Sequence, residues 1–167
     1  MTFHVLHIIK TYQQTFILKM GLISFLKNAG ASIFGSSEAD KAEEAAKIKA
    51  HVEQFGLGIE DFKVTVVEDK VTLEGVASSQ ADREKVIMAA GNVEGVATVE
   101  DLITVEVPEP EAQWYTVEKG DSLSKISKHF YDDYMKYPVI FEANKPMLSD
   151  PDKIYPGQVL RIPPLSE

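Results

Sequence analysis

The sequence contains no cysteine among its 167 residues. This absence excludes disulfide bonds, metal sites built on thiolates and a cysteine nucleophile. Basic residues are also scarce, because 17 Lys and Arg stand against 26 Asp and Glu, giving a formal net charge of -9. Binding to a phosphate backbone needs a clustered basic surface, so the composition argues against nucleic acid as a partner.

Long apolar segments are missing as well, and no apolar stretch of the sequence is long enough to span a bilayer. An apolar patch occupies residues 5–9. It lacks the basic start, the longer apolar core and the small-residue cleavage site of a secretory leader. Met20 offers a second start. We therefore expect residues 1–19 to be either a leader segment or a misassigned start.

Patterns for catalysis or for a side-chain metal site are not found. The four histidines are His4, His7, His51 and His129. They form no zinc spacing such as His-x-x-x-His. The carboxylate pairs Asp132 with Asp133 and Asp150 with Asp152 are too short for calcium loops and favour turns or caps. No serine has a partnered His and Asp context. The sequence therefore predicts a binding protein and not an enzyme.

A short acidic segment divides the chain in two. Residues 108–112 read PEPEA. Prolines cannot donate to a sheet and glutamates favour water, so this segment is predicted to be a linker. It separates one domain at 38–107 from another at 113–167. Domains of this size bury only part of their surface, which leads us to expect that the two dock against each other.

Before the first domain, residues 20–37 show a helical spacing of apolar side chains. The stripe comprises Leu22, Phe25, Leu26, Ala29 and Ile33. Spacings of three and four place these side chains on one face of a helix. The sequence thus predicts a short amphipathic helix that ends near a glycine and packs on the first domain.

The region 38–107 predicts an α+β domain. Ala, Glu and Lys dominate residues 39–55 and favour a helix. The alternating runs 62–67 and 70–75 predict a hairpin. Ser79 then caps a second helix that Gly91 ends, and a last strand covers 96–107. We expect helices on one face of a three-stranded mixed sheet.

The region 113–167 predicts the order strand, helix, helix, strand (βααβ). A strand begins at Trp114, and Asp121 or Ser122 can accept hydrogen bonds from the first turn of a helix. A second short helix is expected over 138–144. A Pro-Gly turn at 156–157 then leads into the final strand.

Two family resemblances follow from these motifs. The segments VTLEG at 71–75 and GNVEGV at 91–96 resemble the BON family. The segments GDSL at 120–123 and PGQVLRIP at 156–163, with Asn144 between them, resemble the LysM family. BON domains are binding modules without known catalytic residues, whereas LysM domains commonly bind chains of N-acetylglucosamine.

The LysM resemblance implies a sugar groove between two segments of this chain. By position the groove residues are Gly120, Asp121, Ser122, Leu123, Pro151, Asp152, Lys153 and Ile154. The alternative interpretation is that these residues only cap a helix and turn the chain.

The order BON then LysM resembles a group of small cytoplasmic potassium-binding proteins of Gram-negative bacteria. The resemblance implies a monomer that binds potassium ion selectively, becomes more compact on binding, and acts as a sensor or buffer under stress. A large monovalent cation is well served by main-chain carbonyls. Helix C-termini supply unpaired carbonyls at the negative end of the helix dipole.

Two helix ends next to glycines are the candidate cation ligands. The predicted carbonyls are those of Leu26, Ala29, Gly91, Val93 and Val96. The alternative is that each glycine simply ends a helix. Two other functions stay open. One is an envelope protein that binds peptidoglycan through the LysM domain. The other is a protein adaptor with Trp114, Tyr115 and Tyr155 on an exposed patch.

Overall fold

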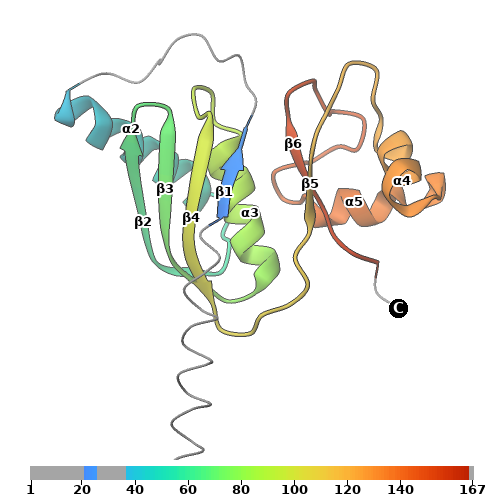
Figure 1. Ribbon diagram of the computed structural model, residues 1–167, viewed down its shortest axis with the longest axis horizontal. Helices are drawn as coiled ribbons and strands as arrows, with labels where there is room; N and C mark the ends of the chain where they lie inside the picture. The colour runs from blue at the N-terminus through green and yellow to red at the C-terminus, as the bar shows by residue number, and fades with distance from the viewer. Residues whose placement is uncertain (1–20, 26–36, 166–167) are drawn as a thin grey trace, which may run out of the picture.

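The computed structural model describes residues 21–25 and 37–165 (Figure 1). The described residues form two β-sheets, one of four strands in the order β1-β4-β3-β2 and one of two strands, β5 and β6. The predicted leader at 1–19 and most of the predicted N-terminal helix lie outside this part of the chain. Within it, no helix is long and apolar enough to cross a membrane.

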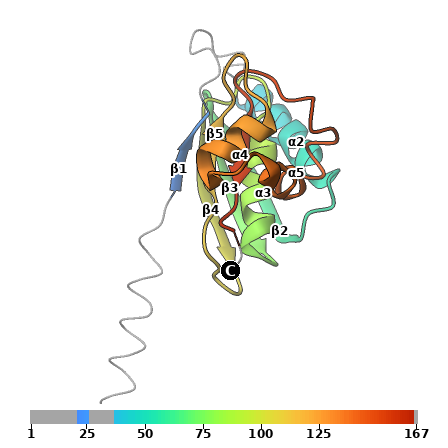
Figure 2. The same ribbon diagram turned by 90° about the vertical axis from the view of Figure 1, so that its right-hand side faces the viewer.

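The first domain contains the larger sheet and two helices on one side of it (Figure 2). Its elements are β1 (Gly21–Ser24), α2 (Glu38–Glu53), β2 (Ile59–Val67), β3 (Lys70–Ala77), α3 (Gln80–Gly91) and β4 (Thr98–Val105). The predicted hairpin and the Ser79 cap are confirmed. Helix α2 begins with a capping box, in which Ser37 and Asp40 each bind the other's amide.

The predicted helix beginning at Leu22 is wrong for the residues that the structure describes there. Residues 21–24 form β1, which pairs antiparallel with β4. Leu22 is exposed, whereas Ile23 packs against the core and Phe25 is buried. Four residues are too few to distinguish the strand period of two from the helical period, so pairing with β4 decides between strand and helix. The mixed sheet therefore has four strands and not three.

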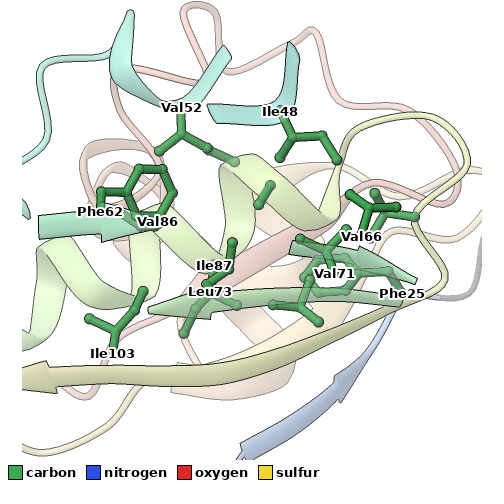
Figure 3. Close-up of a cluster of buried hydrophobic side chains, with 14 of the residues drawn as sticks. Phe25, Ile48, Val52, Phe62, Val66, Val71, Leu73, Val86, Ile87 and Ile103 are labelled. Atoms are coloured by element: carbon green, nitrogen blue, oxygen red, sulfur yellow. The ribbon is translucent and has the colours of Figure 1, made fainter. Parts of the chain in front are cut away.

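The core of the first domain lies between the sheet and its two helices. Figure 3 shows Ile48 and Val52 of α2 reaching toward the sheet, with Val71 and Leu73 of β3 among the side chains that they meet. Alternate residues of each strand point into this core, as strand geometry requires. One member of the same cluster, Val159, belongs to the second domain.

The second domain confirms the predicted order of strand, helix, helix and strand. Its elements are β5 (Gln113–Thr116), α4 (Leu123–Tyr131), a 3-10 turn η1 (Tyr134–Lys136), α5 (Tyr137–Ala143) and β6 (Val159–Ile162). Ser122 is the residue that caps α4. Leu123, Ile126 and Ile140 form a separate small core with Leu160 and Ile162 of β6.

All four residues of β6 are buried, which shows that both faces of this strand are covered. Leu160 and Ile162 point into the core of the second domain. Val159 and Arg161 alternate with them and point toward α3 of the first domain. In Figure 1 β6 accordingly lies close to α3, and it also contacts α5. The two domains are docked through this strand.

Candidate cation site at the end of helix α3

Helix α3 ends at Gly91, and residues 91–96 turn the chain toward β4. The Asn92 amide donates to Met88 O at 3.0 Å, and the Val93 amide donates to Ala90 O at 3.3 Å. Val96 N–H in turn donates to Val93 O at 3.2 Å, so the loop closes on itself. These bonds satisfy carbonyls of the last helical turn. They also fix the direction of the carbonyls that follow.

Two of the predicted ligands, the carbonyls of Gly91 and Val96, accept no hydrogen bond from any residue that the structure describes. The Val93 carbonyl has one amide partner, but a carbonyl oxygen carries a second lone pair. All three oxygens belong to the loop at the negative end of the α3 dipole. An arrangement of this kind suits a monovalent cation that exchanges its water shell for carbonyls.

Phe25 brings the chain that leaves β1 to this same loop. Its amide donates to Ala97 O at 2.7 Å, and its ring is buried against Gly91. A β-carbon built on Gly91 would lie 2.0 Å from the Phe25 Cζ atom. The other two predicted ligands, Leu26 and Ala29, lie outside the described residues. Leu26 follows Phe25 directly in the sequence.

Side chains offer a cation no comparable cage in the part of the chain that the structure describes. No group of three or more His, Asp or Glu side chains there is arranged to hold a metal ion. The acidic side chain of the loop, Glu94, is exposed. The candidate cation site therefore depends on main-chain oxygens.

Several residues of the predicted sugar groove make hydrogen bonds that stabilise the fold. The carboxylate of Asp121 accepts hydrogen bonds from the Tyr115 hydroxyl and the Glu118 amide, both at 2.8 Å. Burial, followed by the hydrogen bond to Asp121, raises the pKa of Tyr115 to about 12. The Ser122 hydroxyl caps α4, and the Gly120 carbonyl accepts a hydrogen bond from Lys125 Nζ at 2.8 Å. These roles match the structural alternative for the segment 120–123.

The fold nevertheless brings the two groove segments together. Val117 N–H donates to Gln158 O, and Gly157 N–H donates to Val117 O, both at 2.8 Å. Leu123 is buried in the same small core against which Ile154 packs. In the second segment, Pro151 is half-buried, whereas the side chains of Asp152 and Lys153 are exposed. Polar groups at this edge thus stay accessible.

The exposed aromatic patch predicted for a protein adaptor is not formed. Trp114 packs against the core of the first domain and Tyr115 against that of the second. Neighbouring residues of a strand point to opposite faces, so these two rings cannot share a surface. Tyr155 is 48% exposed.

A buried polar contact between the domains was not foreseen from the sequence. Arg161 Nε donates to Glu84 Oε2, and the two side chains are almost fully buried. The other oxygen, Glu84 Oε1, accepts hydrogen bonds from Gln80 Nε2 and from the Ala112 amide, both at 2.8 Å. One carboxylate thus joins α3, the end of the linker and β6.

A second unforeseen contact involves two asparagines on the edge of β6 that faces away from β5. Asn92 Nδ2 donates to Val159 O at 2.9 Å, and Val159 N–H donates to Asn92 Oδ1 at 3.0 Å. Asn144 of the second domain binds both main-chain groups of Arg161 in the same way, at 2.8 and 2.9 Å. The sequence did contain one signal for docking, the run of apolar residues at 86–90 in α3. A helix that is apolar on every side must be covered on every side.

Comparisons with known proteins agree with this two-domain structure. The family model of the BON domain matches residues 37–107, and that of the LysM domain matches residues 115–163. The chain is 44% identical over 147 residues to "Potassium binding protein Kbp" of Escherichia coli O6:H1, which covers 86% of this chain and 99% of that protein. An uncharacterized protein of Deinococcus radiodurans is 57% identical over 49 residues, or 29% of this chain and 19% of that protein. The predicted order of BON and LysM domains is confirmed, and the chain belongs to the same BON–LysM family as the Escherichia coli protein.

Proposed function

We propose that this protein reversibly binds potassium ion through main-chain carbonyls at the end of α3 and in the segment that follows β1. The observation that carries the proposal is the contact of Phe25 with Gly91 and Ala97, which brings the residue directly after β1 to the loop that follows α3. The name of the Escherichia coli relative, a potassium binding protein, supports the choice of ion.

The chemistry of the loop favours potassium over smaller or more strongly charged cations. Potassium loses its water shell easily, and neutral carbonyl dipoles can replace that shell. Magnesium dehydrates reluctantly and is usually held by carboxylates. The Phe25 ring packed on Gly91 removes water from one side of the loop and holds the helix end in place. We expect a site that discriminates by cavity size and by the number of carbonyls.

Isothermal titration calorimetry tests the proposal directly. The protein is first dialysed into a choline chloride buffer, and KCl or NaCl is then titrated at constant ionic strength. We expect a saturable signal for one potassium ion and a much weaker one for sodium. Equal heats for the two ions, or no heat for either, would refute potassium binding.

The position of the ion requires a separate experiment. Rubidium resembles potassium in size and gives an anomalous X-ray signal, so a crystal grown in RbCl locates the site. We expect the anomalous peak beside the carbonyl oxygens of Gly91 and Val96. A peak far from residues 91–96 would leave potassium binding intact but place the site elsewhere.

We further propose that potassium makes the protein more compact and that it serves in the cytoplasm as a potassium sensor or buffer under stress. The docked arrangement of the two domains through β6 supplies the more compact state. Small-angle scattering should show a smaller radius of gyration when KCl replaces choline chloride. Recovery of the native protein in a periplasmic fraction would contradict the cytoplasmic assignment.

Glycan binding by the LysM domain is the second candidate function. It is favoured by the packing of Leu123 and Ile154, one from each groove segment, in the same small core. Purified peptidoglycan sacculi and soluble N-acetylglucosamine oligomers are the ligands to test. If the groove binds sugar, Asp152→Ala and Lys153→Ala should reduce retention on sacculi, because these exposed side chains border the groove. Wild-type protein that is not retained would remove this candidate.

A further inference from the structure

Asn92 lies inside the loop that carries the candidate cation ligands, and its side chain reaches the other domain. It follows Gly91 directly and precedes Val93 and Val96. Its amide group binds the carbonyl and the amide of Val159 at 2.9 and 3.0 Å. Val159 is itself buried in the core of the first domain. The Asn92 side chain therefore connects the loop to the second domain.

The contact has the geometry of a strand pairing. In an antiparallel pair, alternate residues turn their N–H and C=O groups away from the partner strand. Val159 and Arg161 turn theirs away from β5 toward Asn92 and Asn144, respectively. Each asparagine side chain supplies the one donor and the one acceptor that a third strand would otherwise provide. The two contacts are chemically alike, but one crosses between domains and the other stays within the LysM domain.

Docking also has a support that is remote from the loop. Glu84 precedes Asn92 by about two helical turns, and its carboxylate pairs with Arg161. This ion pair can hold β6 against α3 whether or not the loop carries an ion. The Asn92 contact differs, because its strength depends on where the loop places the side chain.

We propose that Asn92 is a positioning residue that links cation occupancy of the loop at 91–96 to docking of the LysM domain. The inference rests on the proposed potassium site. A cation drawn in by the carbonyls of Gly91 and Val96 fixes the main chain on both sides of Asn92 and so fixes its side chain against Val159. By thermodynamic reciprocity, docking must raise cation affinity by the same factor as the cation favours docking.

Hydrogen exchange tests the link on the unmodified chain. Val159 N–H is bound by Asn92 across the domain boundary, whereas Arg161 N–H is bound by Asn144 within the domain. Adding KCl in place of choline chloride should slow exchange at Val159 by about 5-fold or more, the low end of typical couplings between sites. Exchange at Arg161, on the same strand, should change much less. Equal slowing of the two amides would overturn the inference.

A double-mutant cycle in potassium affinity tests the same link by a second route. Arg161→Glu places a carboxylate against Glu84 and should separate the domains, which a larger radius of gyration would reveal. Asn92→Ala should weaken potassium binding by about 5-fold or more in the docked chain. It should cause no further loss in the Arg161→Glu chain, because Asn92 acts through docking.

The possible failures can be told apart. A wild-type chain that gives no heat with KCl overturns the proposed function. A wild-type chain that binds potassium while Asn92→Ala binds it equally well overturns only the inference. The inference also fails if Asn92→Ala weakens binding by the same factor in both backgrounds, since that shows a local role, or if the folded Arg161→Glu chain stays docked. If Arg161→Glu does not fold, the exchange rates of the wild-type chain still decide.

Discussion

The Phe25 ring covers Gly91 so closely that no side chain fits between them. A β-carbon on Gly91 would stand 2.0 to 2.3 Å from three atoms of the ring. Glycine is required at the end of α3 because the ring occupies the space of a side chain. The same contact ties β1 to the loop that follows α3.

Gly91→Ala should destabilise the protein and weaken potassium binding together. Overpacking of a core typically costs about 1–3 kcal/mol. The free energy of unfolding can be measured by urea denaturation and the affinity by calorimetry. Phe25→Ala removes the ring, so adding Gly91→Ala to it should cost little more. An equal cost of Gly91→Ala in the two backgrounds would show that the ring is not the cause.

Arg161→Met should lower the free energy of unfolding by about 3–5 kcal/mol, because it leaves the Glu84 carboxylate buried without its partner. The matched control is Arg83→Met, which breaks the pair with Asp101 inside the first domain. Both variants should lose stability, but only Arg161→Met should increase the radius of gyration in scattering. A docked Arg161→Met chain would show that the ion pair does not hold the domains together.

Asn144→Ala should destabilise the second domain. Asn144 is fully buried and binds the carbonyl of Ile140 as well as both main-chain groups of Arg161. Each main-chain group that it leaves buried and unpaired costs about 1–3 kcal/mol. Asn144→Asp keeps the acceptor for Arg161 N–H but places a buried carboxylate oxygen against the carbonyls of Ile140 and Arg161, so it should destabilise the domain at least as much as Asn144→Ala. Thermal melting of the two variants compares them, and a higher melting temperature for Asn144→Asp would contradict the role of the two donated hydrogen bonds.

Stability should fall in alkaline solution partly through Tyr115. Burial and the Asp121 hydrogen bond raise the pKa of this hydroxyl from 10.0 to about 12. A group whose folded pKa is raised stabilises the fold below the unfolded pKa, and this contribution is lost as the pH rises from 10 to about 12. Tyr115→Phe should therefore lose less stability than wild type across this window in urea denaturation.

Tyr134→Phe is the control for the alkaline experiment, because Tyr134 is 54% exposed. Its stability should decline with pH as that of the wild type does. If Tyr115→Phe declines just as steeply, the Tyr115 hydroxyl does not contribute to the pH dependence.

Most elements of the fold could be predicted from local pattern. The hairpin of β2 and β3 follows from alternating β-branched residues, and the starts of α3 and α4 follow from the caps Ser79 and Ser122. The strand β1 could not be predicted, because its four residues are too few to distinguish a period of two from a helical period. Its identity depends on pairing with β4, a contact distant in sequence.

The contacts between the domains could not be predicted for a similar reason. Glu84 and Arg161 lie 77 residues apart, and Asn92 and Val159 lie 67 residues apart. The sequence on either side of each of these four residues gives no sign of its distant partner. Of the candidate cation ligands, Gly91 could be placed from the helix stop that it supplies. The closeness of Phe25 to Gly91 depends on the sheet order, which the sequence does not state.

The insertion of Val159 into the first core constrains how the protein is made. Ribosomes synthesise chains from the N-terminus at about 5–20 residues per second, so Val159 follows Asn92 by about 3 to 13 s. During that interval α3 has been synthesised, but the strand that covers one of its apolar sides has not. The nascent first domain therefore exposes an apolar surface to chaperones and to neighbouring nascent chains until β6 is synthesised and docks.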